Sequence, residues 1–279
     1  MTTAPDGARV GAAFAPPAGA PVAGPRDILV SELFSAIQGE AALVGERQVF
    51  VRLTGCNIRC GYCDQPEALE RRPGPCRVER TAGRRDWSTE SSPLAIEGVV
   101  EAVGRLWDQV PHHSISLTGG EPLLQGTRVE RLTAACTERG WPVMVETNGT
   151  LVPPMRKLAG AVAYVSMDVK LRSVDGETVA PTTQATFLAA ALAGGATTWV
   201  KIVIGPDTDT DEFDAAVAMV AAVSADAGAA GDRTLRVRVG RWPCGSAERP
   251  AHAGGSGAPG RAGRGPARRW APRSPCRTG

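Results

Sequence analysis

The chain has 279 residues, of which 43% are hydrophobic, and a formal net charge of +2. This length allows one domain with tails, and no apolar run approaches the ~20 residues that a membrane-spanning helix needs. Residues 240–279 hold eight arginines and one glutamate, so the rest of the chain is net negative, which argues against a nucleic-acid-binding surface on the folded part.

The first 26 residues are rich in Ala, Pro and Gly and contain no apolar signal-peptide core. Their composition predicts a disordered extension, since it offers little apolar surface to bury. The seven cysteines are an odd number, which disfavours a disulfide framework. We therefore expect a reduced, cytoplasmic protein.

Strand-like and helix-like patterns alternate through the middle of the chain. Apolar, β-rich runs predict strands at 48–53, 114–117, 142–146, 162–169, 199–204 and 235–239. Helical spacing is clearest after Pro93, and we expect helices at 94–110, 128–139, 186–193 and 212–223. Six strands separated by helices indicate a parallel sheet of the α/β class. Sites in such folds lie at the C-terminal ends of the strands.

Three cysteines follow the first of these strands with the spacing CxxxCxxC: Cys56, Cys60 and Cys63. Three thiolates on one turn can hold three corners of a cubane iron–sulfur cluster. The fourth iron then stays open, as the metal does in a catalytic site. The alternative is structural zinc, which usually takes four ligands, and the nearest fourth candidate is Cys76 in the loop 72–76.

The surrounding segments carry a resemblance. The cysteine loop, residues 55–64 with Tyr62 before the third cysteine, resembles the signature of radical S-adenosylmethionine (SAM) enzymes. The segments ELFSAIQGE (32–40), FVRLTGCN (50–57), LTGGEPL (117–123) and ETNGT (146–150) resemble the 7-carboxy-7-deazaguanine synthase family of the deazapurine (queuosine) pathway. The resemblance covers about residues 29–205 and implies a partial (β/α)6 barrel.

The resemblance also implies the chemistry. A [4Fe–4S] cluster would bind SAM and pass an electron to its sulfonium. The resulting radical would take hydrogen from C6 of 6-carboxy-5,6,7,8-tetrahydropterin, whose ring contracts to 7-carboxy-7-deazaguanine with loss of ammonia. The implied cluster ligands are Cys56, Cys60 and Cys63, and the implied SAM contacts are Tyr62, Gly120, Ser166 and Lys170.

The implied pterin contacts are Ile37, Gln38, Gly39, Arg52 and Thr118. An arginine can bind a carboxylate through two parallel hydrogen bonds, which suits a carboxylated pterin. The alternative for Arg52 is a solvated arginine at a strand edge.

Two features depart from the family pattern. Gln65 stands where the family has a threonine that helps bind Mg²⁺. An amide oxygen can ligate Mg²⁺, but the longer side chain would displace the ion. Ser166 and Lys170 match a Ser-x-Lys element with two extra residues between them.

The composition changes abruptly near residue 240. Residues 240–279 contain no Leu, Ile, Val, Phe or Met and are rich in Arg, Pro and Gly, which predicts a disordered tail. A shifted reading frame after about Val239 would produce this change. An RNA-binding tail is the alternative, although Trp242 and Trp270 are its only aromatic residues. We thus expect a disordered extension at 1–26, a radical SAM core at 27–239 and a tail at 240–279.

The implied partners are the pterin, an electron donor such as flavodoxin or ferredoxin, and a second copy of the chain in a homodimer. Neither a membrane nor a nucleic acid is expected as a partner. Two other functions stay open. One is activation of a glycyl-radical enzyme, against which the segment 34–40 argues. The other is a non-catalytic cluster-binding remnant that lacks the family's C-terminal part of the site.

Overall fold

The structure is a computed structural model that describes residues 24, 27–176, 179–228 and 235–241. The described residues belong to one compact unit. Apart from Gly24, Gly240 and Arg241, the two extensions expected to be disordered lie outside the described residues. The domain boundaries stay predictions.

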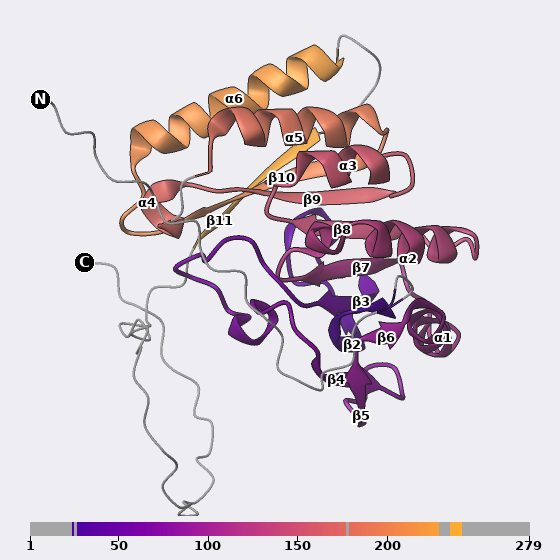
Figure 1. Cartoon of the computed structure of the whole chain (residues 1–279). Coiled ribbons are helices and arrows are strands. Elements are labelled where there is room, and N and C mark those ends of the chain that lie inside the picture. Colours follow the sequence, from indigo (N-terminus) through magenta and orange to yellow (C-terminus); the bar gives the residue numbers. More distant parts are fainter. Residues whose placement is uncertain (1–23, 25–26, 177–178, 229–234, 242–279) are drawn as a thin grey trace, which may run out of the picture. The chain divides into compact units, whose positions relative to one another are not determined.

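Six parallel strands form the larger part of the sheet (Figure 1). In spatial order they are β3 (Arg47–Leu53), β7 (Ser114–Gly119), β8 (Val143–Thr147), β9 (Tyr164–Val169), β10 (Thr197–Ile204) and β11 (Leu235–Arg241). They are the six strands that the sequence predicts, in chain order across the sheet. The α/β class with a mostly parallel sheet is confirmed.

Three further strands extend the sheet beyond β3 and were not predicted. β2 (Val30–Ile37) pairs antiparallel with β3, and β4 (Gly74–Glu79) and β5 (Trp87–Ser92) follow it. β4 and β5 have largely polar sequences of six residues each, so pairing of β4 with β2 and of β5 with β4, rather than local pattern, stabilises them. The expectation that Cys76 lies in a loop is wrong, because it lies in β4 and its side chain is fully buried.

The helices form one layer along the sheet. They are α1 (Ile96–Trp107), α2 (Thr127–Thr137), α3 (Val152–Leu158), α5 (Pro181–Ala193) and α6 (Thr210–Gly228). Each contacts the next in that order, and Figure 1 shows them stacked from α1 to α6. Short turns complete the described fold: η1 (Ala41–Leu43), η2 (Pro66–Ala68), η3 (Pro122–Gln125) and α4 (Arg172–Asp175). Within the described residues, no helix has the length and hydropathy needed to cross a bilayer.

The predicted helix 94–110 is shorter in the structure. Residues 94 and 95 form β6 (Leu94–Ala95), which pairs with β1 (Asp27–Ile28), and α1 begins only at Ile96. Backbone hydrogen bonds to a distant segment therefore override the apolar spacing at the start of this helix.

The two faces of the parallel sheet differ in chemistry because successive side chains of a strand point to opposite faces. Val49, Val51 and Leu53 are fully buried in the apolar core against the helices. The alternate positions carry most of the polar groups, together with a few large apolar side chains such as Phe50, Met144 and Trp199. We call the polar groups the polar face: Gln48, Ser114, Ser116, Thr118, Glu146, Ser166, Asp168 and Lys201.

Candidate active site

The cysteine loop follows the C-terminal end of β3 and is held by backbone hydrogen bonds on two sides. Gly55 N donates to Ala68 O over 2.8 Å, and Gly61 N donates to Asp175 O over 2.9 Å. Cys56 and Cys60 are half-buried, Cys63 is exposed, and all three thiols are free. The loop backbone is thus fixed while its thiols stay accessible.

The loop after β7 packs directly on the cysteine loop. A Cβ atom on Gly120 would lie 2.3 Å from Gly55 O and 2.7 Å from Ala68 O, so only glycine fits there. Glu121 N also donates to Gly55 O over 2.7 Å. The structure places Gly120 beside the cysteine loop, and its contact with SAM stays a prediction.

Glu121 connects the loop after β7 to the loop after β8, and the sequence analysis missed it. Its fully buried carboxylate accepts hydrogen bonds from Leu123 N (3.0 Å), Asn148 N (2.7 Å) and Thr147 Oγ1 (2.9 and 3.0 Å). Burial raises the pKa of Glu121 to about 7, against the lowering effect of these donors. The only signal in the sequence is a glutamate directly after two glycines at a strand end.

Asn148 continues this connection to the cysteine loop. Its Nδ2 donates to Asn57 Oδ1 over 2.9 Å and lies 3.9 Å from Cys56 Sγ. Asn57 Nδ2 in turn donates to Thr150 Oγ1 over 2.8 Å. The segment ETNGT is therefore joined to the cysteine loop by side-chain contacts.

The end of β9 supplies a buried charge cluster on the other side of the cysteine loop. Lys170 Nζ donates to Tyr62 Oη over 2.8 Å and to Asp168 Oδ2 over 3.0 Å, and its side chain is 4% exposed. Burial would lower the pKa of Lys170, but Asp168 raises it well above its usual value, so the ammonium stays charged. Despite the two extra residues in this element, Lys170 reaches the cysteine loop.

Cys60 lies close to this cluster. Burial raises the pKa of its thiol to about 12, although Lys170 acts in the opposite direction. An iron ligand must be a thiolate, so cluster binding releases this proton.

On the polar face, two of the predicted pterin contacts meet at Glu146. Its carboxylate accepts hydrogen bonds from Gln38 Nε2 (2.8 Å), Thr118 Oγ1 (3.0 Å) and Ser116 Oγ (3.3 Å). Ser166, a predicted SAM contact, is buried beside Glu146 on the next strand. Glu146 was not predicted as a site residue, because its position opposite Gln38 depends on the tertiary structure.

Arg52 lies beside Thr118 in the sheet and is not a solvated arginine at a strand edge. Its Nε donates to Glu32 Oε2 over 3.0 Å, its side chain is 17% exposed, and its guanidinium lies 5.8 Å from the centroid of the Phe34 ring. Arg77 forms a second ion pair with Glu32. A hollow of about 520 Å³ borders this group and is lined by residues of β2 to β5, among them Glu32, Phe34 and Trp87.

The other predicted positions are less central. The side chain of Ile37 is 52% exposed, and Gly39 is also exposed. Gln65 directly precedes η2, where its carbonyl accepts a hydrogen bond from Ala68 N over 3.0 Å. The structure therefore does not bring Ile37 and Gly39 into the cluster around Glu146.

The three loop thiols are free, and the nearest candidate for a fourth cysteine ligand lies elsewhere in the fold. Across the described residues, no three His, Cys, Asp or Glu side chains are grouped closely enough to bind one metal ion, and Cys76 is buried in the core. The burial of Cys76 argues against its use as the fourth ligand of a structural zinc site. A cubane is larger than one ion and takes its thiolates at separate corners, which suits three free thiols on one fixed loop.

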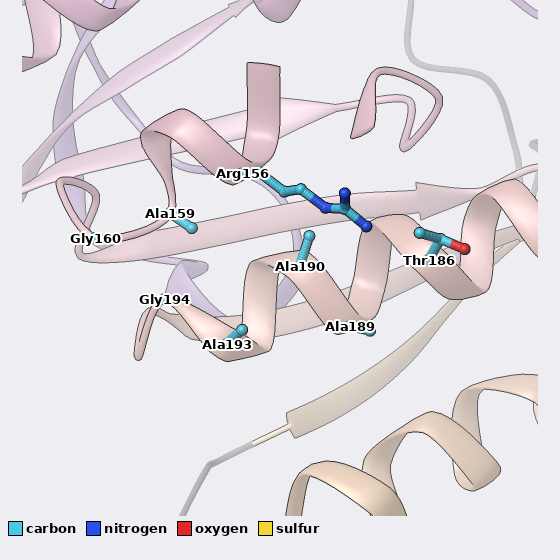
Figure 2. A pocket seen from close by; sticks show the side chains of 8 residues that line it. All are labelled: Arg156, Ala159, Gly160, Thr186, Ala189, Ala190, Ala193 and Gly194. Carbon is cyan, nitrogen blue, oxygen red and sulfur yellow. The ribbon is translucent and has the colours of Figure 1, made fainter. Parts of the chain in front are cut away.

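A second hollow, of about 490 Å³, lies between α3 and α5 on the helix layer (Figure 2). It is lined mainly by small residues, with Arg156 and Thr186 as its polar side chains. It lies on the side of the sheet opposite the polar face and is not part of the candidate site.

The chain is similar to known proteins in sequence and in fold. A family model described as the radical SAM superfamily matches residues 50–220. The chain is 38% identical over 200 residues to the 7-carboxy-7-deazaguanine synthase of Geobacter sulfurreducens, covering 71% of this chain and 78% of the relative. It is 41% identical over 147 residues to the synthase of Methanopyrus kandleri, covering 52% of this chain and 57% of that protein.

Among solved structures, the crystal structure of QueE from Escherichia coli matches with a TM-score of 0.50 and 20% identity, covering 76% of this chain and 84% of that one. At this identity the match supports the fold alone. The superfamily match and the similarity to the Geobacter protein show that the chain belongs to the radical SAM superfamily and, within it, to the 7-carboxy-7-deazaguanine synthase family.

Proposed function

We propose that this chain converts 6-carboxy-5,6,7,8-tetrahydropterin to 7-carboxy-7-deazaguanine with loss of ammonia, using SAM and a [4Fe–4S] cluster. The observation that carries the proposal is the meeting of Gln38 and Thr118 at Glu146, on a polar face that ends at the cysteine loop. Family membership supports the same reaction and leaves the glycyl-radical alternative without support.

Cys56, Cys60 and Cys63 would hold the cluster, which when bound supplies the electron that cleaves SAM. Residues of the chain around the cysteine loop would position the bound SAM. Gly120 allows the two loops to approach, and Lys170 places a permanent positive charge beside Tyr62. Such a charge suits the carboxylate of SAM.

The pterin would lie on the polar face, with its ring N–H groups at Glu146 and its carboxylate at Arg52. A carboxylate such as Glu146 can accept two parallel hydrogen bonds from the adjacent N–H groups of a pterin ring. The Nε of Arg52 is bonded to Glu32, and the remaining guanidinium nitrogens suit the carboxylate of the substrate. Holding the substrate at both ends limits which hydrogen a reactive radical can take.

Mg²⁺, an electron donor such as flavodoxin or ferredoxin, a homodimer and a cytoplasmic location complete the proposal and rest on family resemblance alone. Because Gln65 replaces the family's threonine, Gln65→Thr is expected to raise the ratio of turnover with Mg²⁺ to turnover without it. Threonine provides a shorter oxygen donor for this hard cation. An unchanged ratio contradicts a role for this position in metal use.

The test is an anaerobic assay of the reconstituted full chain with SAM, dithionite and the pterin, followed by mass spectrometry. The expected products are 7-carboxy-7-deazaguanine and 5′-deoxyadenosine, and a variant without the three loop cysteines should form neither. Cleavage of SAM without the deazapurine would contradict the substrate. A complete cluster with neither product would favour the non-catalytic remnant.

A further inference from the structure

The tip of the β2–β3 hairpin reaches across the polar face. We call residues 38–46 the strap. It is closed by hydrogen bonds from Gln38 N to Glu46 O (2.8 Å) and from Gly45 N to Gln38 O (3.0 Å). The turn η1 within it lies beside β10 and β11, although β7, β8 and β9 separate β3 from β10. The strap thus spans the width of the parallel sheet.

Two side chains of the strap bond to the polar face. Gln38 bonds to Glu146, and Glu40 Oε2 lies 2.9 Å from Lys201 Nζ on β10. The side chain of Lys201 is 17% exposed and that of Glu40 is 67% exposed. Hence Glu40 is the solvated partner of this pair, and Lys201 is the buried one.

Lys201 also belongs to the charge cluster beside the cysteine loop. Its Nζ lies 3.2 Å from Asp168 Oδ1, while Lys170 Nζ lies 3.0 Å from Asp168 Oδ2. Lys170 in turn bonds to Tyr62. A continuous series of contacts therefore joins the strap to the cysteine loop through Lys201, Asp168 and Lys170.

We propose that Glu40 and Lys201 are positioning residues that hold the strap, and with it Gln38, over the bound pterin. This inference rests on the proposed function. Lys201 contacts both Glu40 of the strap and Asp168, and Asp168 also pairs with Lys170 beside the cysteine loop. The pair with Glu40 is exposed on one side, so it is weak and salt-sensitive, which suits a strap that must release substrate and product.

The first test is Glu40→Gln, which removes the charge and keeps the shape. We expect the pterin Kd, measured anaerobically by calorimetry, to rise about twofold to fivefold, the range of a partly exposed ion pair. The SAM Kd and kcat should stay unchanged. Pterin affinity should fall with added salt in the wild type and fall less in Glu40→Gln. The control is Lys157→Met, which breaks a surface pair with Glu130 at 4.0 Å.

The second test is Lys201. Lys201→Met should weaken both pterin and SAM binding, because Asp168 then loses one of the two lysines that pair with it among the described residues. Lys201→Arg should restore part of the pterin binding. An unchanged pterin Kd in Glu40→Gln, or equal weakening of both ligands in that variant, overturns the proposal.

Hydrogen exchange separates this inference from the proposed function. In the reconstituted protein without substrate, amides 39–45 should exchange faster in Glu40→Gln than in the wild type and in Lys157→Met. If the wild type binds no pterin, the proposed function fails, and exchange still decides whether Glu40 holds the strap. Equal exchange in all three proteins shows that it does not.

Discussion

Replacing Glu121 by glutamine is expected to destabilise the loops that surround the cysteine loop. The Glu121 carboxylate accepts hydrogen bonds from two backbone N–H groups, one on each of its oxygens. Glutamine offers one oxygen, so one buried N–H group must face the amide NH₂. Leaving one buried donor unsatisfied costs about 1–3 kcal/mol, and we expect that loss in the free energy of unfolding at pH 7.5.

The same group predicts the sign of a pH effect. The pKa of Glu121 rises from 4.5 to about 7 on folding because the carboxyl is buried. A raised carboxyl pKa means that the native state binds the proton more tightly. Its stabilising contribution is complete below pH 4.5 and is lost as the pH rises through 7. At about 1.4 kcal/mol per pKa unit, the loss is on the order of 3 kcal/mol.

Anaerobic urea unfolding of the wild type and Glu121→Gln at pH 5, 6, 7 and 8 measures both effects. The wild type should lose stability relative to the variant as the pH rises. Glu101→Gln, at an exposed position of α1, is the control and should stay within about 0.5 kcal/mol of the wild type. Equal urea midpoints for wild type and Glu121→Gln at every pH would refute the reasoning.

Three further predictions concern the cluster and the substrate. Changing any of the three loop cysteines to alanine should abolish binding of cluster iron, whereas Cys136→Ala, in the buried core, should retain the iron. Iron analysis measures this, and loss of iron from Cys136→Ala would contradict the ligand assignment. Gly120→Ala should lower iron content sharply because its Cβ would meet backbone atoms within 2.7 Å; full iron retention is the contrary result. Arg52→Lys should weaken pterin binding by about 1–3 kcal/mol with little effect on SAM binding, because lysine cannot form the two parallel hydrogen bonds of a guanidinium with a carboxylate. Equal weakening of both ligands in calorimetry argues against binding of the substrate carboxylate by Arg52.

Local patterns in the sequence were sufficient for much of the fold and part of the site. The cysteine spacing places three thiols on one loop whatever surrounds it, and the apolar runs predict the six parallel strands. The glycine pair before Glu121 also indicates a close approach of two backbone segments, because glycine has no Cβ atom to prevent that approach. These features depend on residues near one another in the chain.

Other features were decided by the tertiary structure. The strands β4 and β5 have no strong local pattern; β4 forms by pairing with β2, and β5 by pairing with β4. Glu146 becomes the meeting point of Gln38 and Thr118 only through the strand order, and Glu40 meets Lys201 across 161 positions of sequence. Periodicity predicts which face of a strand a side chain occupies, but the order and register of strands decide which charges meet on that face.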